Sequence, residues 1–166
     1  MTADATPDEI ANAARRHIVD ELHGDHLRVK RAYQRFQTLD AQADGAQREA
    51  LVAHVLDELT VHAALEQELL YPALRETLPD TRRVDAAERD HVELHALINP
   101  LRTLKPDDEQ YAAHFSALCV HALRHMKWEE ARLFPLLAHA GLDWARLEGD
   151  IDQRREELVV AEAPVA

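Results

Sequence analysis

Two segments of the chain repeat a pattern that combines an imidazole, a carboxylate and an aromatic-proline pair. Residues 62–74 read His-Ala-Ala-Leu-Glu-Gln-Glu-Leu-Leu-Tyr-Pro-Ala-Leu, and residues 125–137 read His-Met-Lys-Trp-Glu-Glu-Ala-Arg-Leu-Phe-Pro-Leu-Leu. Both contain His-x3-Glu, and side chains four residues apart lie on one face of an α-helix, about one turn apart. Each segment therefore aims an imidazole and a carboxylate at one point, which is how a helix offers two ligands to a single metal ion.

These ligand types lie on the apolar stripes that mark the inward faces of the predicted helices. In the second predicted helix, Leu51, Val55 and Leu59 recur at helical spacing. The same stripe continues through His62 and Glu66. A buried imidazole or carboxylate costs several kcal/mol unless it is paired or binds a metal ion. Stripes on the other three helices are interrupted in the same way, at His26, His91, His95, His125 and Glu129.

A shared metal site explains these seven interruptions together, although each histidine taken alone would be interpreted as a hydrogen-bonded core residue. Five imidazoles and two carboxylates exceed the three or four protein ligands of one zinc ion, and a set without thiolates suits borderline-to-hard ions. We therefore expect two metal ions about 3.5 to 4 Å apart, bridged by carboxylates from different helices. Iron is favoured if the site performs oxygen chemistry, with manganese or zinc as substitutes.

The composition predicts an all-α protein. The 166 residues include only 4 Gly, 7 Pro and 5% aromatic residues, with Ala, Leu, Glu and Arg abundant, which favours helices over strands. The length suits a single domain with a substantial core. We expect an antiparallel up-down four-helix bundle over residues 16–140. Residues 1–15 would form an N-terminal tail and leading helical turns, and residues 141–166 an additional C-terminal helix and tail.

Proline and glycine indicate how the helices begin, bend and end. Pro7 suits the first position of the first helix. Gly24 leaves two alternatives open, a kink in one long helix or a break after a short leading helix. Pro72 predicts that the second helix bends or ends in its last turn, and Pro100 predicts a kink near the end of a third helix over about residues 81–104.

Charge and cysteine content exclude several classes of protein. A net charge of −12 with histidine neutral would repel phosphate backbones and anionic lipids, so we expect neither nucleic acid nor a membrane as a partner. Cys119 is the single cysteine, so no intramolecular disulfide can form. The first ten residues lack the apolar segment of a signal peptide, and no apolar run approaches the length needed to span a bilayer. These features predict a cytoplasmic protein.

The pattern resembles the hemerythrin-like HHE cation-binding domain family, over roughly residues 16–139. That resemblance implies a four-helix bundle with a non-haem di-iron centre. It assigns metal ligands to each helix in chain order: His26 of the Asp25-His26 pair, His62 with Glu66, His91 with His95, and His125 with a following carboxylate.

The carboxylate of the fourth helix has two candidates. The internal repeat selects Glu129, whereas the spacing in oxygen-carrying hemerythrins selects Glu130. Glu129 lies on the apolar stripe and Glu130 about 100° round the helix from it, so we favour Glu129. With His95 included, one iron would have three imidazoles and the other two.

The resemblance implies that dioxygen or a related small oxidant, such as peroxide or nitric oxide, binds at an open position on the iron with fewer histidines. Oxygen reduction, catalase-like peroxide removal, and iron storage or sensing are alternatives at the same centre. A further alternative is a structural or regulatory helical module that metal only holds together. Oligomer contacts could then form through the C-terminal helix. A ferritin-like site would require two Glu-x-x-His motifs, and the chain has one, ending at His91.

The remaining histidines and the aromatic residues are assigned ordinary roles. His121 is one turn before His125 and would extend the cluster if it turned inward. Tyr71, Phe134, Trp128 and Trp144 are predicted to pack in the core. The other histidines are predicted to be solvated or to support the ligands: His17, His23, His54, His114 and His139.

Overall fold

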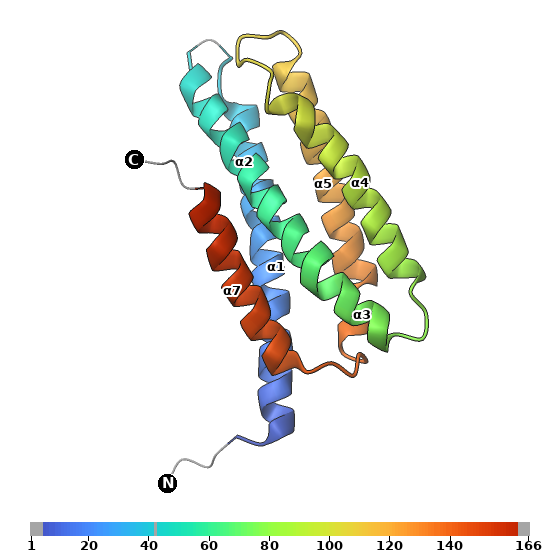
Figure 1. Cartoon of the computed structure of the whole chain (residues 1–166). Helices are drawn as coiled ribbons and strands as arrows, with labels where there is room; N and C mark the ends of the chain where they lie inside the picture. Colours follow the sequence, from blue (N-terminus) through green and yellow to red (C-terminus); the bar gives the residue numbers. More distant parts are fainter. Residues whose placement is uncertain (1–4, 42, 163–166) are drawn as a thin grey trace.

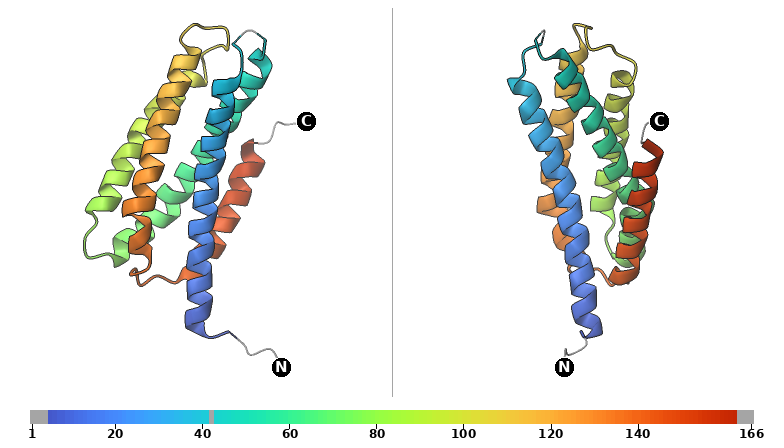
Figure 2. Two further views of the ribbon diagram at one scale, coloured as in Figure 1. Left: turned by 180° about the vertical axis from the view of Figure 1, so that it is seen from behind. Right: turned by 90° about the vertical axis from the view of Figure 1, so that its left-hand side faces the viewer.

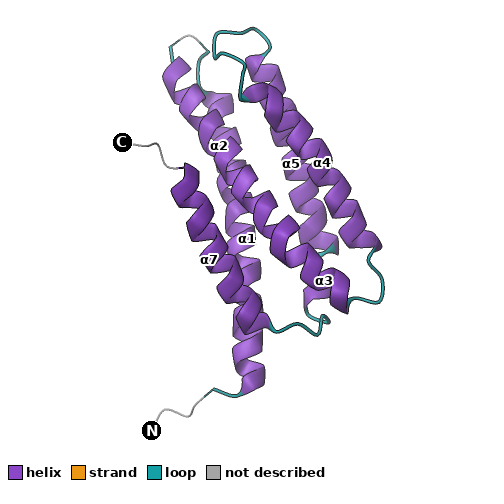
Figure 3. Cartoon of the chain, in the orientation of Figure 1, coloured by secondary structure: helices purple, strands orange, loops and turns teal. Residues whose placement is uncertain are grey.

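The computed structural model describes residues 5–41 and 43–162, and all regular structure within them is helical (Figure 3). In chain order the elements are α1 (Pro7–Thr38), α2 (Gly45–Leu65), the π-helix η1 (Glu66–Leu70), α3 (Tyr71–Thr77), α4 (Arg82–Leu101), α5 (Tyr111–Arg132), α6 (Phe134–Leu137) and α7 (Trp144–Glu162).

Four long helical runs form the predicted up-down bundle. They are α1, the continuous run α2–η1–α3, α4 and α5, and the turns after α1 and α4 lie at one end of the bundle while those after α3 and α6 lie at the other (Figure 1). Helix α7 lies alongside α1 and α2 on the outside (Figure 2). The predicted fold, a four-helix bundle with an additional C-terminal helix, is confirmed.

Helix α1 is one uninterrupted helix of 32 residues, so the break considered at Gly24 does not occur. Pro7 is its first residue, as predicted. Thr6 and Glu9 form a capping box, in which the Glu9 amide donates to Thr6 Oγ1 at 3.3 Å and the Thr6 amide donates to Glu9 Oε2 at 2.8 Å. These bonds satisfy backbone donors that the first turn of a helix leaves free.

The second helical run continues through Pro72 by way of the π-helix η1. The Tyr71 amide donates to the Glu66 carbonyl, five residues back instead of four. One extra residue in the turn changes the direction in which all later side chains of the helix point, and such π segments are frequent at functional sites. The sequence predicted that the helix either bends or ends at Pro72. It does not end there, because α3 extends to Thr77. Pro100 lies in the last turn of α4, which ends at Leu101.

The apolar core consists of two clusters, one on each side of a buried polar layer. On α1, Leu22 belongs to one cluster and Val29 to the other, and buried His26 lies between them. On α4, Ala87 and Leu94 flank His91 in the same way. The polar layer is thus enclosed by apolar side chains along the bundle axis, which keeps bulk water away from it.

Helix α7 packs against this bundle through an apolar face. Trp144, Leu147 and Ile151 are buried in the same cluster as Ile18 of α1. Contact of α7 with a second chain stays a prediction. Across the described ranges, none of the helices combines the length and the apolar character that a bilayer crossing demands.

Candidate metal centre

Six of the predicted ligands converge in the buried polar layer. Their side chains come from four different helical runs, and each residue is between 0 and 3% exposed. The set consists of His26 from α1, His62 from α2, Glu66 from η1, His91 from α4, and His125 and Glu129 from α5.

The six residues form two overlapping groups that share Glu129. In the first, Glu66, His91, His125 and Glu129 each offer one ligand atom, all within 4.8 Å of one another. In the second group, one ligand atom each of His26, His62 and Glu129 also lies within 4.8 Å of the others.

The two glutamates lie between the two histidine pairs. Glu66 Oε2 is 3.3 Å from His62 Nε2 and 3.2 Å from His91 Nε2. Glu129 Oε2 is 3.6 Å from His26 Nε2 and 3.5 Å from His125 Nε2. Each carboxylate therefore reaches both pairs, which is the arrangement required to bridge two ions.

Unpaired buried atoms at this point fit a metal site. Nε2 of His26, Nε2 of His62, Oε1 of Glu66 and Oε2 of Glu129 are all buried without a hydrogen-bond partner. Orphaned buried polar atoms are rare because each costs about 1–3 kcal/mol. Metal ions at the centre would give these atoms partners, and the donor set of imidazoles and carboxylates suits iron, manganese or zinc.

Carboxylates behind the histidines fix the direction in which the imidazoles point. Asp25 Oδ2 lies 3.0 Å from His62 Nδ1, and Asp90 Oδ2 lies 3.2 Å from His125 Nδ1. A carboxylate accepts the Nδ1 proton, so Nε2 is left with its lone pair toward the centre. Sequence analysis gave these aspartates no such role. The available signal is that each directly precedes a candidate ligand, although it supports a histidine of the neighbouring helix.

Glu130 plays the same supporting part for His26. Its Oε1 is 2.7 Å from His26 Nδ1 and 3.0 Å from Nδ1 of His23, which is about half exposed. Glu129 occupies the centre, as the helical stripe favoured, whereas Glu130 faces outward and contacts the far side of the His26 ring. His23, His26 and Glu130 also approach one another closely enough to form a small group near the surface.

Tyr71 is a member of the site that the sequence analysis assigned only to packing. Its hydroxyl lies 2.9 Å from Glu66 Oε2, 2.7 Å from Glu129 Oε1 and 3.2 Å from His91 Nε2. The aromatic-proline pair of the repeat held the signal, because the first copy has a hydroxyl where the second has Phe134. Phe134 packs as predicted, stacked on His26 with ring centroids 5.7 Å apart.

His95 does not join the cluster, contrary to the five-histidine set that was predicted. It lies four residues along α4 from His91, which places it about 6 Å further along the helix axis. There its Nε2 is 3.1 Å from Gln67 Oε1, and the side chain is partly exposed. His121 is buried but also lies outside the cluster, with Nε2 3.0 Å from the Asp90 carbonyl oxygen.

The buried charges shift the pKa values of the central residues in opposite directions. Burial alone would raise the pKa of Glu66, but the charges and hydrogen bonds of His62 and His91 hold it well below its ordinary value. Burial alone would lower the pKa of His62, but Glu66 and the hydrogen bond to Asp25 hold it well above its ordinary value. Without metal, the His62 proton therefore balances part of the carboxylate charge, and a bound ion would displace it.

The fold and the buried donors define a helical metal-binding protein, and sequence comparison identifies its family. A family model described as the hemerythrin HHE cation binding domain matches residues 17–137, more than half of the chain's 166 residues. The chain therefore belongs to the hemerythrin HHE cation-binding domain family. Comparison with curated protein sequences gave no match.

A solved structure shares the fold. It is the crystal structure of a hemerythrin HHE cation binding domain-containing protein from Mycobacterium kansasii, with 20% sequence identity and a TM-score of 0.69. The match covers 84% of this chain and 85% of that chain. Helix α7 begins after the residues that the family model matches.

The pKa of His62 predicts how the metal-free protein responds to alkaline pH. A histidine whose folded pKa is raised contributes stability that is complete below its unfolded pKa, ordinarily 6.5, and is lost as pH rises through the folded value. Burial lowers the pKa of His125, so this residue makes the protein more stable as the pH rises, but its effect is smaller than that of His62. We expect the free energy of unfolding in urea, with a chelator present, to be constant with respect to His62 below its ordinary pKa of 6.5 and to fall as the pH rises above it. The metal-free His62→Gln variant should lose most of this decrease; an equally steep decrease would contradict the assignment.

The Tyr71 hydroxyl should stabilise the metal-free centre. Hydrogen bonds to charged groups contribute about 1.5–3 kcal/mol, so Tyr71→Phe should lower the free energy of unfolding of the metal-free protein by about that amount. Tyr33→Phe is the matched control, because the Tyr33 ring packs against Phe115 away from the carboxylates. Urea denaturation measures both variants, and equal losses would show that the contacts of the Tyr71 hydroxyl contribute nothing specific.

Proposed function

We propose that the chain is a non-haem di-iron protein whose centre binds and reduces a small oxidant, with peroxide or dioxygen as the substrate. The observation that supports this proposal is the placement of Glu129 between two histidine pairs, with Glu66 beside it. His26 and His62 would hold one ion, His91 and His125 the other, and the two glutamates would bridge them. When bound, two iron ions supply two electrons and direct binding positions for the oxidant.

The remaining side chains would orient the ligands, exclude water and hold a proton. Three carboxylates fix three of the four imidazoles from behind, as described above. Leu22 and Val29, each 1% exposed, belong to the apolar layers that enclose the centre on its two sides. Tyr71 Oη holds a proton between Glu66 and Glu129, within reach of a molecule bound at the centre.

The position of His95 favours turnover over reversible oxygen carriage. The predicted five-histidine set would leave one ion crowded with three imidazoles and open only the other. With His95 held by Gln67, two histidines would be available to each ion, which would leave room for an exogenous ligand at both. Two adjacent open positions suit the binding and cleavage of a molecule with an oxygen-oxygen bond.

The experiment combines metal content, absorption and peroxide consumption. Protein loaded anaerobically with ferrous iron should hold about two iron ions per chain, as in two-metal sites generally. Its oxidised form should show charge-transfer absorption that changes with dithionite, azide or peroxide. His125→Ala should lower the rate of peroxide consumption by at least about 100-fold, because losing even an outer partner of a metal ligand costs about 10- to 100-fold and His125 is a candidate ligand itself.

His114→Ala is the matched control for that variant. His114 lies on the same helix, α5, but is partly exposed, and its Nδ1 contacts the Gln110 carbonyl oxygen. This variant should keep wild-type iron content and peroxide consumption. A colourless protein that takes up only zinc, with peroxide consumption no faster than in His125→Ala, would contradict the proposal and favour a bundle that metal merely staples together.

A further inference from the structure

Helix α7 lies outside the matched residues 17–137, yet one of its side chains reaches the layer behind the candidate centre. Arg155 Nη1 donates to Asp25 Oδ1 at 3.0 Å, and Arg155 Nη2 donates to Asp25 Oδ2 at 2.9 Å. Asp25 is fully buried, and the same Oδ2 accepts the hydrogen bond of His62 Nδ1. A continuous path of hydrogen bonds therefore joins α7 to the subsite of His26 and His62.

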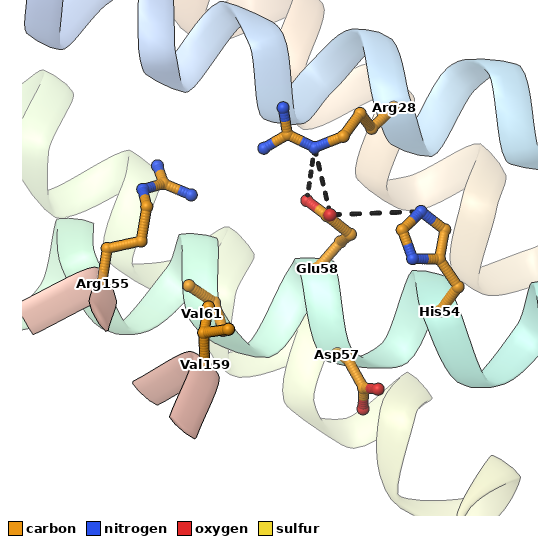
Figure 4. A pocket seen from close by; sticks show the side chains of 7 residues that line it. All are labelled: Arg28, His54, Asp57, Glu58, Val61, Arg155 and Val159. Carbon is orange, nitrogen blue, oxygen red and sulfur yellow. Dashed lines mark hydrogen bonds and ion pairs between the residues drawn. The ribbon is translucent and has the colours of Figure 1, made fainter. Parts of the chain in front are cut away.

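Asp25 also contacts Arg28, but the two arginines are not equivalent. Arg28 pairs with Oδ1 of Asp25 only, and its Nε is shared with both carboxylate oxygens of Glu58 at 3.0 Å (Figure 4). Arg155 holds both oxygens with its planar fork, including the one that His62 uses. A bidentate guanidinium restricts the rotation of a carboxylate as well as balancing its charge. Arg155 therefore determines where Oδ2 points.

The arginines also separate Asp25 from a water-accessible hollow. A pocket of about 440 Å³ lies among α1, α2 and α7 and is lined by both arginines together with His54, Asp57, Glu58, Val61 and Val159. Figure 4 shows Arg155 extending from α7 toward α1. Because Asp25 is fully buried while its two arginine partners line the pocket, shortening Arg155 would open a route for water to the Asp25–His62 hydrogen bond.

The other supporting aspartate lacks such a clamp. Asp90, which contacts His125 Nδ1, has a side chain that is 35% exposed, and no arginine pairs with it anywhere in residues 5–41 or 43–162. The arginine support is therefore confined to one of the two subsites. Because of this asymmetry, an effect of Arg155 on one subsite can be distinguished from an effect on the whole centre.

We propose that Arg155 is a positioning residue of the metal centre: through Asp25 it holds His62 with Nε2 toward Glu129, and so sets the metal affinity of the His26–His62 subsite alone. The proposal rests on the proposed function in one respect, namely that the centre holds two ions. On this proposal, α7 contributes to the metal site in addition to packing against the bundle.

Anaerobic titration of the metal-free protein with ferrous iron alone, followed by calorimetry, tests this proposal. In Arg155→Met one of the two ions should bind about 10- to 100-fold more weakly, and the other should keep its wild-type affinity. Arg155→Lys should fall between, because an ammonium supplies the charge without the fork. Two ions bound with wild-type affinities, or both weakened equally, would overturn the proposal.

Arg154→Met is the matched control. Arg154 is the neighbouring residue of α7 and pairs with Glu68 and Glu157 on the surface, away from Asp25. This variant should bind both ions as the wild type does. Trp144 is 6% exposed in the contact between α7 and the bundle. In a Trp128→Phe background, where Trp144 is the single tryptophan, unchanged fluorescence on adding Arg155→Met would verify that α7 stays docked. A red-shifted emission, showing an undocked helix, would count against a specific positioning role.

A second measurement needs no metal. In the metal-free wild type and in Arg154→Met, the proton on His62 Nδ1 should exchange slowly with water and give an NMR resonance coupled to that nitrogen. In Arg155→Met its exchange should be accelerated at least tenfold, and unchanged exchange would contradict the role of Arg155. If the wild type takes up fewer than two ions, the proposed function fails, and this measurement decides the role of Arg155 separately.

Discussion

Two carboxylates buried side by side in the core impose the constraint on which the rest of the structure depends. Glu66 and Glu129 are both 0% exposed, and each lies within 3.6 Å of two imidazoles. Burying such charges without partners would cost far more than a small domain can supply. In the metal-free state the four histidines, the Tyr71 hydroxyl and the proton on His62 compensate for the buried charge of the two carboxylates. Metal ions would displace that proton and supply more positive charge.

The outer layers follow from the same requirement. An imidazole is a ligand only if its Nε2 faces inward, so Asp25, Asp90 and Glu130 each hold the far nitrogen of a histidine on another helix. These contacts connect α1 to α2, α4 to α5, and α5 to α1. They fix the relative positions of the helices at the level of the centre, where apolar packing alone would permit sliding. Arg155 extends this cross-helix arrangement to α7.

Much of the fold and part of the centre could be predicted from sequence because both depend on helical periodicity. The His-x3-Glu spacing places His62 with Glu66, and His125 with Glu129, on inward stripes. Periodicity assumes an unbroken α-helix, so it could not anticipate the π-helix that brings Tyr71 to the carboxylates.

Contacts between helices were beyond the reach of the same reasoning. His95 has the right spacing on α4, but the π segment opposite presents Gln67 to it in place of a ligand. The support of one helix's histidine by another helix's aspartate depends on how the helices are rotated against each other, and one-dimensional spacing does not contain that rotation. For the same reason Arg155, 130 positions from Asp25, gave no signal.

The central claim is that six converging side chains form two adjacent ion sites that share carboxylates. Anomalous diffraction at the iron absorption edge, from crystals of the iron-loaded protein, tests it most directly. The structure predicts two peaks about 3.5 to 4 Å apart, one beside His26 and His62 and the other beside His91 and His125, with Glu129 between them. A single peak, or peaks only at the surface group of His23 and Glu130, would contradict it.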